Sequence, residues 1–359
     1  MQIKKKINKL NKLYIIFFST VLFIYSFLTV SLNANTFKIT NLEISEPFEL
    51  NFDKEKVIDK AFKYAFEELV EMTTISNDKE KIQNIPIETI KGLIDSFEMS
   101  DEEFIDNKYQ VKFDVNFNKK NTLIFFEKKN IFPSIPLKKK ILLIPIIVDL
   151  ESDEILIYSK NQFYNKWNQN KKRYFLLEYL LLNEDLEDVK VILDNSKSIE
   201  DYNFKEIIKK YDLSDFIITI IYKSNNQLRI LSKIQLNNSF KINNQTFNDI
   251  NINSQEDFNL VLDKLKIIYE NYWKKINQIN TSIKTPLTIS IESSRHKKIK
   301  EIENSLYDLD LVLNFNISKF DNNNLFFKII YNGSPKKFIQ EMEKKNIKMI
   351  NKNQIWKIK

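Results

Sequence analysis

Apolar and polar positions between residues 35 and 132 predict an α+β module. Apolar side chains in residues 58–72 recur at intervals of three and four, which is the period of one buried helix face. Residues 109–117 alternate strictly between apolar and polar side chains, which predicts a strand with one wet face. The other expected elements are strands at 37–45 and 93–99, an acidic loop at 101–106 and a short helix at 119–129.

A continuous apolar run at residues 141–148 predicts a strand that is covered on both faces. The pattern that follows alternates between helix and strand, which predicts a small α/β layer sheet. Its expected elements are a helix near 162–182, a strand at 189–193, a helix near 199–211, a strand at 215–222, and a hairpin through Asn225 and Asn226 to a strand at 228–236.

The last third of the chain begins with a helix, because Ser254 and Asp257 resemble a capping box before a long amphipathic stretch. Residues 286–359 then follow the order βαββαβ, which predicts a ferredoxin-like split sheet. Ser334 followed by Pro335 marks the start of its second helix, because it combines a capping side chain with a first-turn proline.

The fold class expected is therefore α/β and α+β, with a small α/β layer domain between ferredoxin-like units. The boundaries expected are 1–34 for a leader, 35–132 for an α+β module, 138–250 for an α/β module, 251–285 for a connecting amphipathic helix and 286–359 for a βαββαβ module. Residues 108–131 and 325–347 share an element order and the sequence EKKNI, which favours a degenerate internal duplication.

The leader is a run of twenty uncharged residues, 13–32, which five lysines precede. This pattern indicates either a cleaved secretory signal, with Ala34 as the small residue before the cleavage point, or an uncleaved anchor in the inner membrane. Both alternatives leave the amino terminus in the cytoplasm and place the rest of the chain in the periplasm or another extracytoplasmic space.

Composition excludes several classes of site. The chain of 359 residues has two glycines, one histidine and no cysteine, so dinucleotide and phosphate loops, zinc centres, thiol nucleophiles and disulfides are not expected. Asparagine is expected to occupy turn positions where glycine is usual. We expect no nucleic-acid partner, because the leader lysines account for most of the net charge of +7. Residues 274–359 hold 17 basic and 8 acidic side chains, which favours contact with an anionic membrane surface or another protein.

The strongest chemical candidate is an acidic cluster directly after the strand predicted at 141–148. Ligands of open α/β sheets gather at such strand ends, and hard cations prefer carboxylates. The cluster consists of Asp149, Glu151, Asp153 and Glu154, which are weak metal-ligand candidates with a solvated loop as the alternative. We expect no cofactor and assign no catalytic residue.

Three further groups have an ordinary structural interpretation. Asp101, Glu102 and Glu103 are expected in an exposed turn. His296 lies between Arg295 and Lys297, which favours a solvent-facing position. An aromatic group at helical spacing is suited to stacking on sugars but is expected to be core, and it consists of Phe163, Tyr164, Trp167, Tyr174 and Phe175.

Three segments carry a resemblance to a known family. The helix sequence VIDKAFKYAFEELVEM, the strand sequence KYQVKFDVNF and the apolar run ILLIPIIV follow the leader in that order. In this respect the first 240 residues or so resemble an uncharacterised family of bacterial secreted proteins, domain of unknown function 2066. The resemblance implies an envelope protein and supplies no catalytic residues.

These observations together favour a non-enzymatic exported protein that acts by protein–protein contact, as a scaffold or accessory factor of an envelope complex. Two alternatives stay open at this point. One is a carboxylate-dependent hydrolase of cell-wall or surface glycan. The other is a protein whose basic C-terminal domain binds anionic lipid.

Overall fold

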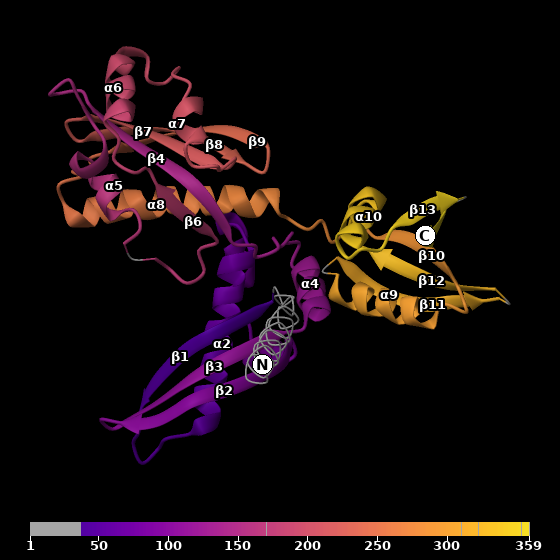
Figure 1. The fold of residues 1–359 in the computed structure, drawn as a ribbon. Coiled ribbons are helices and arrows are strands. Elements are labelled where there is room, and N and C mark those ends of the chain that lie inside the picture. Colours follow the sequence, from indigo (N-terminus) through magenta and orange to yellow (C-terminus); the bar gives the residue numbers. More distant parts are fainter. Residues whose placement is uncertain (1–36, 170, 310, 322, 353, 359) are drawn as a thin grey trace, which may run out of the picture. The chain divides into compact units, whose positions relative to one another are not determined.

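A computed structural model describes residues 37–169, 171–309, 311–321, 323–352 and 354–358 (Figure 1). It contains three β-sheets together with α-helices, which confirms the mixed α/β and α+β fold class. The predicted leader at 13–32 and its cleavage point lie outside the described residues. No helix in the described part of the chain is long and apolar enough to cross a membrane.

The first sheet is antiparallel, with the strand order β1-β3-β2. Its strands are β1 (Lys38–Pro47), β2 (Ile94–Ile105) and β3 (Lys108–Phe117), and its helices are α2 (Lys54–Thr73), α3 (Ile87–Lys91) and α4 (Lys119–Lys128), with a 3₁₀ turn, η1, at Ser76–Ile82. The alternation in β3 buries every second residue, as the sequence predicts. The expected acidic loop at 101–106 is wrong, because β2 pairs with β3 as far as Ile105 and only Asp106 and Asn107 turn the chain.

The middle sheet has the order β5-β4-β7-β8-β9, with β6 also paired to β4. Its strands are β4 (Lys139–Asp149), β5 (Glu154–Leu156), β6 (Leu177–Leu181), β7 (Phe216–Ser224), β8 (Gln227–Leu236) and β9 (Ser239–Asn248). Its helices are α5 (Gln162–Lys166), α6 (Leu186–Asp194), α7 (Lys205–Lys209) and α8 (Gln255–Ile276), with 3₁₀ turns η2 (Tyr158–Lys160) and η3 (Ser196–Ser198). Strand β4 runs parallel to β6 and β7 and is their common neighbour.

Both faces of β4 are buried, which confirms the interpretation of the apolar run. Ile141 and Leu143 pack in a cluster with α5 and α8, whereas Leu142 and Ile144 pack in a separate cluster with α6 and α7. Figure 1 shows α8 along one face of the sheet and α6 with α7 over the other. Helix α8 begins after Ser254, whose side chain accepts from the Asp257 amide, and its apolar face belongs to the core of the middle sheet.

Three expectations for the middle region are wrong or incomplete. The helix expected near 162–182 ends at Lys166, and β6 occupies 177–181. The strand expected at 189–193 is part of helix α6, whose start is capped by the Asp185 side chain. Strand β9 is missing from the prediction, because nearly all of its side chains are exposed or half-buried and leave no strong apolar alternation.

The C-terminal sheet has the order β11-β12-β10-β14-β13. Its elements are β10 (Thr285–Glu292), α9 (His296–Asp308), β11 (Val312–Phe320), β12 (Asn324–Tyr331), α10 (Pro335–Lys344), β13 (Met349–Lys352) and β14 (Ile355–Ile358). The predicted element order is present, but the ferredoxin-like arrangement is not confirmed. The strand after the second helix, β13, lies at the sheet edge, because the β13–β14 hairpin places β14 parallel to β10 instead.

Asparagine replaces glycine at left-handed turns, as the composition predicts. Both glycines have negative φ, whereas Asn130 and Asn346 have φ of 54° and 61°. Each follows a helix and is itself followed by a buried isoleucine, whose amide donates back to Phe126 O at 3.0 Å in the first case and Met342 O at 2.9 Å in the second. The shared EKKNI sequence therefore encodes one helix-ending motif twice, which accounts for that part of the internal echo.

Candidate functional site

The acidic cluster predicted from the sequence forms the turn between β4 and β5. Asp149 ends β4, where one carboxylate oxygen lies 2.8 Å from Lys223 Nζ and the other accepts from the Glu151 amide at 3.1 Å. The Lys223 hydrogen bond and these amide contacts hold the pKa of Asp149 below its usual value. Asp149 therefore anchors the turn to β7 as an ionised carboxylate.

The other members of the cluster do not converge with Asp149. The Glu151 carboxylate accepts from the Asn225 amide, and Asp153 and Glu154 are exposed. Within the described ranges, no three His, Cys, Asp or Glu side chains are grouped to hold a metal ion. The turn is a well-bonded strand connection that leads into the edge strand β5.

The remaining candidates from the sequence lie in separate places. Glu102 accepts from Tyr109 Oη at 2.7 Å and from Lys54 Nζ at 2.6 Å, so it belongs to a polar cluster on the first sheet. His296 is the first residue of α9 and is exposed. Phe163 and Trp167 are fully buried beneath α8, in agreement with the core interpretation of the aromatic group.

A groove lies beyond the acidic turn, between β5 with η2 on one side and the start of α6 on the other. It has a volume of about 430 Å³, and Ile155, Ile157 and Val189 supply much of its apolar lining. Two leucines of α6 extend this apolar surface into solvent, because Leu186 is 86% exposed and Leu193 is 46% exposed. Exposed leucines that border a preformed groove are typical of a contact surface.

Tyr158 forms part of the groove and is held in an unusual conformation. Its φ is 50°, in the left-handed region that a bulky side chain rarely adopts, and only 6% of the residue is exposed. Its ring packs edge-on against Tyr164, with the centroids 5.7 Å apart. The hydroxyl lies near the Asp185 amide but forms no hydrogen bond of acceptable geometry. Burial, with the nearby charge of Asp188, raises the pKa of Tyr158 above its usual value.

The surroundings of the groove are acidic. Residues 149–160 and 182–194 together contain nine acidic side chains and two lysines. Lys210 binds Asp185 and Asp188, at 2.6 Å and 2.7 Å, and these bonds raise the pKa of the lysine. The second carboxylate oxygen of Asp188 is buried without a hydrogen-bond partner. The groove therefore combines an apolar lining, an acidic rim and unsatisfied polar atoms.

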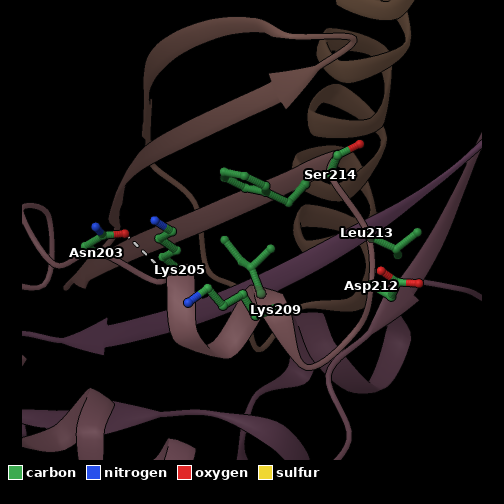
Figure 2. A pocket seen from close by; sticks show the side chains of 8 residues that line it. Asn203, Lys205, Lys209, Asp212, Leu213 and Ser214 are labelled. Atoms are coloured by element: carbon green, nitrogen blue, oxygen red, sulfur yellow. Dashed lines mark hydrogen bonds between the residues drawn. The ribbon is translucent and has the colours of Figure 1, made fainter.

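A more open pocket of about 550 Å³ lies beside α7 on the same side of the sheet. Figure 2 shows Asn203 and Lys205 on one side of it and Asp212 and Ser214 on the other. The Asn203 side chain accepts from the Lys205 amide at 3.1 Å, which is a local turn contact. Its polar groups do not converge on one point, so it is a weaker candidate binding site than the groove.

No protein-family model and no curated protein matches this chain. The groove depends on α6, where the sequence pattern at 189–193 predicts a strand, and on Tyr158, which no sequence motif marks. The spacing of Leu186, Val189 and Leu193 after the capping residue Asp185 is the signal that predicts the helix.

Proposed function

We propose that this chain is an exported, extracytoplasmic accessory protein that binds a partner protein in the groove between β5 and α6. The observation that supports this proposal best is the pair of exposed leucines, Leu186 and Leu193, beside an apolar groove with an acidic rim. The predicted leader and the resemblance to secreted bacterial proteins support the location.

The geometry favours one kind of partner segment. Strand β5 pairs with β4 along one edge, and its other edge meets no strand in the described part of the chain. An extended segment added beside β5 would pair with this edge and direct alternate side chains into the groove. We infer that this segment carries apolar side chains and lysine or arginine residues, because the surrounding segments are acidic.

The test is site-specific photo-crosslinking in the native cell, with the crosslinking residue at position 186. The same residue at Leu50, a fully exposed leucine of the first module, is the matched control. We expect an adduct with one envelope protein at position 186, none at position 50, and loss of the adduct when Leu193→Glu is added. Adducts of equal yield at both positions, or an adduct insensitive to Leu193→Glu, would contradict the proposal.

The charge of the partner is tested separately with the purified protein. A peptide from the crosslinked region of the partner is expected to bind more weakly as salt rises, because screening weakens the attraction to exposed carboxylates. Binding that is independent of salt would contradict the inferred lysine or arginine residues of the partner, and only the apolar contact would remain supported.

A second function, binding to anionic lipid, is favoured by a separate observation on the C-terminal sheet. Tyr307 on α9 and Ile317 and Phe320 on the edge strand β11 are exposed in a region with an excess of lysine. Exposed aromatic side chains among lysines suit an anionic headgroup surface. Co-sedimentation with vesicles that contain anionic lipid is expected to fall with salt and with Phe320→Ser.

The hydrolase alternative gains no support from Asp149, whose lowered pKa does not suit a general acid.

A further inference from the structure

A second, smaller pocket lies on the opposite face of the middle sheet, between α5, β6 and α8. Its volume is about 240 Å³, and its lining includes Trp167, Phe175, Leu177, Tyr179 and Lys266. Pockets for drug-sized ligands measure roughly 300–1,000 Å³, so this one suits a smaller molecule. It is separate from the groove, and nothing in the following argument depends on the proposed function.

Two buried hydrogen-bonding groups of this pocket have no partner. Trp167 is completely buried, and its indole Nε1 forms no hydrogen bond with the described residues. The Tyr179 hydroxyl is also buried without a partner. Buried N–H and O–H groups are normally satisfied, and an unmet donor is unfavourable. Both residues line the pocket, so each is a donor that a bound acceptor would satisfy.

Lys266 adds a buried cation to the same pocket. The residue is 3% exposed, and burial lowers its pKa from the usual value. Among the described residues, its one hydrogen-bond partner is the Gln169 carbonyl at 3.4 Å, although an ammonium group has three donors. The charges that act on it are those of Asp263 and Lys172, which pair with each other at 3.4 Å. Lys266, which lines the pocket, therefore keeps unused donor capacity.

The acidic groups near the pocket are already engaged. Glu270 accepts from the Leu176 amide at 3.0 Å and the Leu177 amide at 2.8 Å, and so its carboxylate faces the start of β6. Glu178 is partly exposed and pairs with Lys171 at 3.5 Å. Neither carboxylate bonds to Lys266.

The apolar walls are preformed. The rings of Trp167 and Tyr179 meet edge to face with centroids 5.4 Å apart, and Trp167 stacks on Tyr269 at 6.0 Å. We propose that this pocket binds a small organic carboxylate with an apolar or aromatic body. The carboxylate accepts from Lys266 Nζ and Trp167 Nε1, and the body lies against Phe175 and Leu177.

The experiment is isothermal titration of the purified protein with benzoate and hexanoate, with benzamide and hexanamide as neutral controls. We expect saturable binding of at least one carboxylate at one site per chain, and binding at least about tenfold weaker for the amides and for Lys266→Met, because a charge-assisted hydrogen bond is lost. Trp167→Phe is expected to weaken binding severalfold. Trp273→Phe is the matched control, because the Trp273 indole already donates to the Leu137 carbonyl at 2.7 Å.

A second measurement uses the wild-type protein and therefore does not depend on whether the variants fold. In the wild-type protein, the Trp167 indole N–H resonance is expected to shift downfield when the carboxylate binds, whereas the Trp273 resonance stays in place. Failure of both carboxylates to saturate, equal affinity for the amides, or full affinity in Lys266→Met would each overturn the proposal.

Discussion

The two faces of the middle sheet are covered in different ways. On one face the long helix α8, of 22 residues, buries Phe258, Leu265 and Trp273 along its length, with the short helix α5 beside it. On the other face α6 and α7 have nine and five residues, and Leu186 and Leu193 remain exposed beside them. A long helix fills one face of a sheet continuously, whereas short helices joined by loops leave hollows between them. The long-helix face therefore suits stability, and the short-helix face suits contact with a partner.

Apart from the small pocket at Trp167 and Tyr179, the polar groups of the two faces differ in the same direction. On the α8 face the Tyr269 hydroxyl contacts Thr219 Oγ1 at 2.9 Å and Ser232 Oγ at 2.7 Å, although all three residues are buried. On the other face the Tyr158 hydroxyl and one oxygen of Asp188 are unpaired. Outside the small pocket at Trp167, we expect the α8 face to lose more stability when its polar groups are changed.

The largest effect is expected at Glu270. Glu270→Ala removes the acceptor for the Leu176 and Leu177 amides and leaves Lys274 without the carboxylate that attracts it most. We expect a loss of about 3–5 kcal/mol in the free energy of unfolding, measured by urea denaturation, because buried charges and amides are left unpaired. Glu270→Gln keeps one acceptor oxygen and is expected to lose less. Equal losses in both variants would show that packing, and not hydrogen bonding, is responsible.

The next effect concerns Lys274. Burial, together with the positive charge of Lys79, lowers the pKa of this lysine to about 8. The attraction of Glu270 and Glu71 opposes this shift. Between this pKa and the usual value of 10.5, the unfolded chain binds more protons than the folded chain, so stability rises with pH. We expect the wild-type free energy of unfolding to rise by about 1.5 kcal/mol from pH 8 to 9.5 relative to Lys274→Met, because one pKa unit corresponds to about 1.4 kcal/mol and the folded lysine is half protonated at the start of this range. Parallel pH profiles for the two proteins would contradict this.

A smaller effect separates two tyrosines. Tyr269→Phe leaves the hydroxyls of Thr219 and Ser232 without their common partner, so we expect a loss of about 1–2 kcal/mol. Tyr158→Phe removes a hydroxyl that has no partner, so stability is expected to stay equal or rise slightly. Chemical denaturation of both variants under one condition makes the comparison. A larger loss of unfolding free energy in Tyr158→Phe than in Tyr269→Phe would contradict the conclusion that the α8 face contributes more to stability.

The smallest effect on stability is expected at Leu186. Leu186→Ser changes an exposed side chain, so the free energy of unfolding should change by less than about 0.5 kcal/mol. The same variant is expected to lose binding to the partner that crosslinking at position 186 identifies. Stability is checked by thermal unfolding and binding by titration. If the variant still binds the partner, Leu186 of α6 is not part of the contact surface.

Much of the fold could be predicted where one periodicity extends over a whole element. The alternation at 109–117 and the continuous apolar run at 141–148 both correspond to strands. The prediction failed at 162–182, because Phe163 and Trp167 give helical spacing for only one turn before the chain leaves the helix. It failed again at 189–193, where valine and isoleucine favour a strand but lie on α6 in the folded chain.

Less of the candidate site could be predicted. The sequence placed the acidic turn correctly after its strand, and Asp149 does end β4. The pairing of Asp149 with Lys223 joins residues 74 positions apart, which no local pattern reveals. Tyr158 becomes notable only through its burial and its φ, and both result from tertiary packing.

The asparagine-based turns bear on how the unfolded chain behaves. Among the residues that the structure describes, eight of the fifteen non-glycine residues with positive φ are asparagine, and neither glycine has positive φ. An asparagine strains slightly in the left-handed region, but before folding it samples fewer conformations than glycine does. Each such reversal therefore costs less backbone entropy when the chain orders. A glycine-poor polypeptide can in this way keep many sharp changes of direction without a correspondingly larger loss of disorder.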